Sequence, residues 1–297
     1  MTTPSESKAP ATQPVPARPG RKLGPIADTV GSSHRAWLEH AREKYLASGL
    51  TLSELGLRVP LAKSKLSELL RGLGLYPRWE VIGRLSEVLG MQIIPLYRLW
   101  RQAALDARKS PEWVQRCSDK SALTAPQPNP PVAHEPFRRT VEGGYRRYAQ
   151  AFLADAPCEA AVDDTFDILW LSWNSALASP DIRRYAWRIL RATVLAKTPH
   201  LDGWPELVPA AFDTVAVRRP TRSSDPTEQL AESLELFRAI GRLPANLQDV
   251  MVLRHLCGNT VEETSALLGV PPPMVRSDER HARRIIFPPP ESEGPIE

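Results

Sequence analysis

The chain has 297 residues, 42% of them hydrophobic, which allows two or three domains with apolar cores. Its net charge of +4 favours polyanionic partners only weakly, so the distribution of charge matters more than the total. The three cysteines form no CxxC pair, which argues against a disulfide framework or zinc ribbon and favours a reducing compartment. No apolar run approaches the roughly 20 residues of a membrane span. We therefore expect a soluble, cytoplasmic protein with no membrane association, metal or cofactor.

The N-terminal third predicts a flexible arm followed by a helical module. Residues 1–31 are rich in Pro, Ser, Thr and Ala and lack aromatic residues, so we expect a disordered, slightly basic arm. Helical spacing begins at Ser32 and continues to about residue 117. Two short helices, at 51–59 and 63–72, are separated by a three-residue break, the pattern of a helix-turn-helix. Further helices at 80–89 and 96–109 would complete a five-helix unit, with its tryptophans in the core.

This module resembles the XRE type of Cro and phage repressors, and more closely an actinobacterial variant in which a segment like Tyr76-Pro77-Arg78-Trp79 follows the recognition helix. The resemblance implies operator DNA binding and allows a homodimer through residues 32–117. The residues it assigns to DNA are Lys63, Ser64, Lys65, Ser67 and Arg71. Three positions depart from the family pattern: Gly56, Pro60 in the turn, and Ala62 where the family has a capping Ser. Because proline cannot take the positive φ of a turn glycine, we expect a locally different turn.

Residues 118–134 form a predicted proline-rich linker, and residues 135–198 a helical domain whose charges are separated along the chain. Five acids and no base lie between Asp155 and Asp167, and five bases and no acid lie between Ile182 and Lys197. An acidic helix suits a cationic protein surface, and a basic stripe beside a tryptophan suits a phosphate backbone or unstacked bases.

The order of these two helices resembles region two of extracytoplasmic-function (ECF) sigma factors of the sigma-70 family. The resemblance implies binding to core RNA polymerase through Glu159, Asp163, Asp164 and Phe166. It also implies contacts to the downstream promoter element from Arg184, Trp187, Arg188 and Arg191. Ala160, Ala192 and Ala196 replace polar residues of the family, so the docking helix is better supported than the promoter-melting helix.

Residues 199–226 predict a second linker, residues 227–287 a final helical domain, and residues 288–297 a disordered acidic tail. Between residues 243 and 286, helical spacing is interrupted at Gly258 and at 269–273, which predicts three short helices ending in a basic one. This segment resembles region four of the same sigma factors, which implies binding to the upstream promoter element. The residues assigned to that contact are Met274, Arg276, Ser277, Arg280 and Arg283. Asp278 stands where the family usually has a cation.

We found no glycine-rich phosphate loop, nucleophile elbow or paired metal-ligating histidines, so we expect a binding protein rather than an enzyme. The favoured function is an ECF-type sigma factor, made of three helical modules, that binds double-stranded promoter or operator DNA and core RNA polymerase. An anti-sigma factor is a further candidate partner. One alternative is a DNA-binding regulator that keeps the sigma fold without initiating transcription. Another is an interaction scaffold that sequesters a transcription partner.

Overall fold

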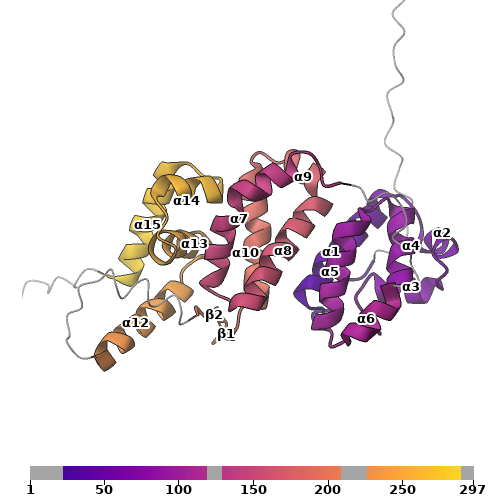
Figure 1. The fold of residues 1–297 in the computed structure, drawn as a ribbon, viewed down its shortest axis with the longest axis horizontal. Helices are drawn as coiled ribbons and strands as arrows, with labels where there is room; N and C mark the ends of the chain where they lie inside the picture. The colour runs from indigo at the N-terminus through magenta and orange to yellow at the C-terminus, as the bar shows by residue number, and fades with distance from the viewer. Residues whose placement is uncertain (1–22, 119–128, 209–225, 289–297) are drawn as a thin grey trace, which may run out of the picture.

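The computed structural model describes residues 23–118, 129–208 and 226–288. These residues are almost entirely helical, as Figure 1 shows, which confirms the predicted all-α class. The strands among them, β1 (His200–Leu201) and β2 (Trp204–Pro205), form a short antiparallel pair that was not predicted. Most of the predicted arm, both linkers and the tail lie outside the described residues.

The N-terminal module is built around its own hydrophobic core. Its helices are α1 (Ser32–Ala47), α2 (Leu52–Arg58), α3 (Lys63–Leu69), α4 (Trp79–Leu89), α5 (Ile93–Asp106) and α6 (Pro111–Ser118). Trp79 and Trp100 are fully buried in this core, as predicted, and the half-buried Trp113 stacks on Trp100 with ring centroids 5.9 Å apart. Residues 23–31, which the sequence assigned to the arm, instead lie against the module, because Leu23, Ile26 and Val30 bury apolar surface there.

The turn between α2 and α3 explains why position 56 is a glycine. An added Cβ on Gly56 would lie 2.8 Å from the carbonyl oxygen of Leu61, so glycine lets the turn close onto α2. The N-terminus of α2 is capped reciprocally by Thr51 and Glu54. By contrast, Ala62 offers α3 no side-chain cap. The turn is therefore held by close backbone packing rather than by a cap on the second helix.

The remaining described residues place most of their buried apolar side chains in one continuous core. Their helices are α7 (His134–Gln150), α8 (Asp155–Leu171), α9 (Trp173–Leu177), α10 (Ile182–Lys197), α12 (Pro226–Gly241), α13 (Ala245–Met251), the π-helical turn η2 (Val252–Leu256), α14 (Val261–Leu268) and α15 (Pro272–Ile286). Apolar side chains of α7, α8 and α10 pack against those of α13–α15. Ile168 and Leu171 of α8 pack instead into the core of the N-terminal module. The predicted boundary between residues 135–198 and 227–287 stays a prediction, since both segments contribute to that core.

Helix α8 lies at the centre of the molecule, with the N-terminal module on one side and α7 and α10 on the other (Figure 1). On the N-terminal side, α1 and α5 contact α8. At the other end of the molecule, α14 contacts α10 and α7. The acidic helix and the basic helix predicted from the sequence, α8 and α10, are therefore both partly covered by other helices. No helix among the described residues is long and apolar enough to cross a membrane.

Candidate nucleic-acid interface

The helix-turn-helix of α14 and α15 is defined at both ends of α14. At its start, Thr260 Oγ1 accepts the Glu263 amide hydrogen bond at 3.1 Å and Glu263 Oε2 accepts that of Thr260 at 2.7 Å. At its end, Gly269 has a φ of +65°, a left-handed conformation that favours glycine. Pro272 then occupies the first turn of α15, where a missing N–H costs no helical hydrogen bond.

Helix α15 presents a basic face to solvent. Val275 and Ala282 on its inner face are fully buried and anchor the helix to the core. The five residues predicted to contact the upstream promoter element are all exposed: Met274, Arg276, Ser277, Arg280 and Arg283. A shallow depression over this face is lined by arginines 276, 280 and 283 with Pro273 and Glu279. Cations gathered on an exposed helix suit the phosphate backbone of duplex DNA.

A largely buried carboxylate fixes α15 against η2. Glu279 accepts hydrogen bonds from Arg254 Nε at 3.3 Å and Arg283 Nη2 at 3.1 Å, and it lies 2.9 Å from His255 Nε2. Burial by itself would raise the pKa of Glu279, but the hydrogen bond and charge of Arg254, with help from His255 and Arg283, hold that pKa below its ordinary value. Glu279 is thus ionised at neutral pH and orients the basic helix from within.

Residues 233–286 match the family model described as Sigma-70, region 4. The match spans most of α12 and all of α13–α15, so it includes the basic face of α15. It supports a sigma-70 family member with a DNA-binding role in transcription, and region 4 is a regulatory domain rather than a catalytic one. No curated protein and no solved structure matches the chain.

The region 4 match packs onto the basic helix α10 through a buried carboxylate, Asp249 of α13. Asp249, 3% exposed, accepts hydrogen bonds from Tyr148 Oη at 2.7 Å, Trp187 Nε1 at 2.8 Å and Arg191 Nε at 2.8 Å. Burial raises the pKa of Asp249, and the Arg191 charge and the three donors act against that rise. Three donors satisfy most of the lone pairs of this carboxylate, which makes its burial tolerable.

The predicted downstream promoter residues are divided by this packing. Arg184 and Arg188 are exposed on α10. Trp187 is 5% exposed and Arg191 is half-buried, because both donate to Asp249. In this structure only the first pair faces solvent, and contact of Trp187 with DNA would require the region 4 match to move away from α10.

The predicted polymerase-binding residues are divided in the same way. Glu159 and Asp163 are exposed and pair with cations of α7, Arg146 at 2.7 Å and Arg138 at 2.9 Å. Phe166 is buried in the core of α7, α8 and α10. Asp164 is 5% exposed, because the N-terminal module covers it. Their role in binding polymerase stays a prediction, and two of the four lie on the surface.

The predicted operator-binding residues lie mainly on α3. Lys63, Ser64 and Lys65 are exposed and Ser67 is half-buried, so they can form one surface. Arg71 differs: it lies just after α3, and its side chain is close to Gly24 of the N-terminal segment. Lys65 Nζ is also 2.8 Å from Glu68 Oε2, which reduces its charge toward DNA.

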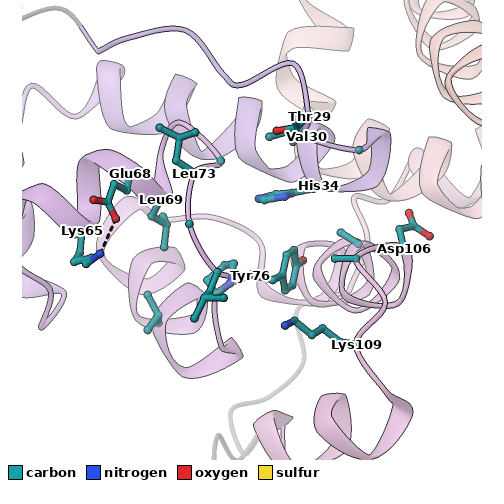
Figure 2. A pocket seen from close by; sticks show the side chains of 18 of the residues that line it. Thr29, Val30, His34, Lys65, Glu68, Leu69, Leu73, Tyr76, Asp106 and Lys109 are labelled. Carbon is teal, nitrogen blue, oxygen red and sulfur yellow. Dashed lines mark hydrogen bonds and ion pairs between the residues drawn. The ribbon is translucent and has the colours of Figure 1, made fainter.

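Beside α3 is an open groove of about 720 Å³, shown in Figure 2. Its walls include Lys65 and Leu69 of α3, His34 of α1 and Tyr76. Burial lowers the pKa of His34 to about 4, so this imidazole is neutral at pH 7. The groove therefore has a mixed lining whose charged groups lie on either side of a neutral aromatic centre.

Sequence reasoning missed Asp249 and Ser33, two of the residues that connect the helical groups. A signal for Asp249 exists, since it lies at helical spacing with Leu253 and Leu256 in an apolar run, where an acid must be paired if buried. Ser33 carries no comparable signal. Among the described residues no group of three His, Cys, Asp or Glu side chains could hold a metal ion. His255, which the sequence places two positions from Cys257, instead pairs with Glu279.

Proposed function

We propose that this chain is a transcription initiation factor of the ECF type that also carries an operator-binding helix-turn-helix in residues 32–117. Residues 135–198 would act as region two and bind core RNA polymerase through α8 and promoter DNA through α10. Residues 227–287 would bind the upstream promoter element. The cytoplasm is the compartment in which these partners meet.

The observation that carries this proposal is the exposed basic face of α15 within the region 4 match. Arg280 is central to that face and has no carboxylate partner within the described residues. Arg276 pairs with the exposed Glu262 at 3.3 Å, an ion pair weak enough for phosphate to replace. Arg283 pairs with the largely buried Glu279 at 3.1 Å, and its own side chain stays exposed.

The DNA contact is tested by Arg280→Ala, with Arg139→Ala on α7 as the control, because Arg139 is also exposed but lies outside α15. We expect Arg280→Ala to weaken binding to the DNA upstream of the protein's own gene. We also expect the slope of log affinity against log salt concentration to become shallower by about one, since one phosphate contact is lost. Fluorescence anisotropy at several salt concentrations measures both. Equal loss in the two variants would contradict a role for this face.

Initiation is tested by reconstituted transcription with core RNA polymerase on the same upstream DNA. The proposal expects a transcript that depends on the added protein, and co-elution of the protein with polymerase. An anti-sigma factor and a homodimer through residues 32–117 remain candidate partners, and neither is needed for this reaction.

A second candidate is a DNA-binding regulator that keeps the sigma fold but does not initiate. The observation favouring it is that Trp187 and Arg191 are held by Asp249 and that Asp164 is covered. Specific DNA binding without a transcript, and without co-elution with polymerase, would select this candidate.

A further inference from the structure

Helix α8 is buried on two faces. One face, including Phe166 and Leu169, lies in the core shared with α7 and α10. The other meets α1 and α5 of the N-terminal module, and its residues define what we call the clamp face: Asp164, Asp167, Ile168 and Leu171. Their spacing places these four side chains on one stripe of the helix. Leu171 is 7% exposed and belongs to the core of the N-terminal module.

The polar part of the contact is specific. Ser33 Oγ lies 3.0 Å from Asp164 Oδ2 and 2.8 Å from Asp106 Oδ2 of α5, so its single proton can be donated to either carboxylate. Asp164 Oδ2 also lies 3.1 Å from Lys197 Nζ. Lys197 Nζ in turn donates to Ser33 Oγ at 3.0 Å. Asp167 Oδ1 accepts from Arg98 Nη1 of α5 at 3.2 Å. Each carboxylate of the clamp face is thus partnered by a residue of the N-terminal module.

The contact nevertheless carries an electrostatic cost. Asp164 and Asp167 are 5% and 6% exposed, and burial raises the pKa of both carboxyls against the opposing effect of Lys197 and Arg98 respectively. Burying a carboxylate costs desolvation free energy that offsets its attraction to a cation, so these pairs contribute little net stability. Such a contact is suited to release when another partner offers cations to the same carboxylates.

We propose that the clamp face is a shared docking surface, on which the N-terminal module and core RNA polymerase exclude each other. The inference rests on the proposed function. The chain as folded here is then a closed form, in which the N-terminal module covers the clamp face. In it, Arg98 and Ser33 of the module contact the carboxylates to which polymerase would offer cationic and apolar groups of its own. Uncovering the clamp face would expose two carboxylates beside Ile168 and Leu171 next to Glu159 and Asp163, which already face solvent.

The closed form leaves the predicted operator-binding surface of α3 exposed. Figure 1 shows α2 and α3 on the side of the N-terminal module away from α8, and Lys63, Ser64 and Lys65 are exposed there. Operator binding therefore does not require the clamp face to open. The same module can hold the chain on DNA while it covers α8.

The test compares Arg98→Glu with Arg101→Glu in the full chain. Both arginines are exposed on α5, but only Arg98 reaches Asp167, so a carboxylate at position 98 repels the clamp face and one at 101 does not. A second variant, Arg98→Glu with Ser33→Asp, also places a carboxylate against Asp164. Hydrogen exchange of the α8 amides reports release of the module, and biolayer interferometry measures affinity for core RNA polymerase.

We expect faster exchange in α8 and a polymerase affinity at least about fivefold higher for Arg98→Glu, with no change for Arg101→Glu. Faster exchange with unchanged affinity, or unchanged exchange in both clamp variants, would overturn the inference. If all the proteins bind polymerase with one affinity, the proposed function survives and the shared surface does not. If none of them binds polymerase, the proposed function fails and the inference fails with it.

Discussion

Single buried carboxylates connect the helical groups of this protein. Asp249 joins α13 to α7 and α10, and Asp164 and Asp167 join α8 to the N-terminal module. Each is nearly inaccessible to solvent, so its ionised form depends on donors from another segment. At the residue scale, the arrangement of the molecule is set by a few acids whose partners lie far away in the sequence.

Asp167 makes this dependence measurable through pH. Burial raises its pKa from 3.8 to about 7, with Arg98 acting in the opposite direction. Between those values the folded chain keeps a proton that the unfolded chain has lost, so the contribution of Asp167 to stability falls as pH rises. We expect the stability of the wild type relative to Asp167→Asn to fall by roughly 2–4 kcal/mol between pH 4 and pH 8.

Urea unfolding of both proteins at several pH values measures that difference. Comparison with Asp167→Asn removes the contributions of other groups, including His34 and His40, whose pKa values burial lowers to about 4. A difference that stays constant with pH would show that Asp167 has the same pKa in the folded and unfolded chains, and wild-type stability that increases with pH relative to Asp167→Asn would show that folding lowers this pKa. Either result would contradict the prediction.

The two helix-turn-helix units begin alike and differ at their second helices. In both, the first helix starts with a reciprocal Thr and Glu cap, at Thr51 and Thr260. The basic helix α15 gains a preorganised start from its prolines, whereas α3 starts after the uncapped Ala62. At the scale of elements, we therefore expect α3 to have the less stable N-terminus.

A serine at position 62 should repair this end. The backbone at Ala62, with φ −59° and ψ 144°, is compatible with an N-cap, and a Ser hydroxyl can accept a hydrogen bond from the first turn. We expect Ala62→Ser to stabilise α3 against local opening by about 0.5–1 kcal/mol. Amide hydrogen exchange within α3 measures this. Ala192→Ser on the exposed side of α10 is the control and should give no gain, because a mid-helix hydroxyl caps nothing.

At the scale of the whole molecule, the region 4 match covers the face of α10 that carries Trp187 and Arg191 and leaves Arg184 and Arg188 exposed. The backbones approach closely at Gly269, where an added Cβ would lie 2.5 Å from the backbone nitrogen of Arg184 and 2.8 Å from Asp181 Oδ1. The Asp181 carboxylate caps α10, so this contact places the end of α14 directly on the start of α10. This contact and the hydrogen bond from Trp187 to Asp249 both hold the region 4 match against α10.

Gly269→Ala should therefore separate the two helices, and Gly90→Ala provides a matched control. Both glycines have a left-handed φ, +65° and +63°, so alanine costs about 1–2 kcal/mol of backbone strain at either position. Only Gly269 also has backbone within clash distance, since a Cβ on Gly90 would meet nothing within 4 Å. We expect faster hydrogen exchange at the start of α10 in Gly269→Ala alone. The same exchange in both variants would mean that the contact contributes nothing.

The sequence by itself determined most of the helices and their breaks, though it missed α6, and it determined the composition of the basic face of α15. It could do so because spacing, caps and positive-φ glycines act over a few residues. It placed Met274, Arg276, Ser277, Arg280 and Arg283 on one helix, and the structure shows them exposed together. Only the tertiary structure decided which charged faces meet solvent. Ser33 and Asp164 are 131 positions apart, and Trp187 and Asp249 are 62 apart. Local periodicity separates a helix into faces, but the partner of each face depends on how distant helices pack.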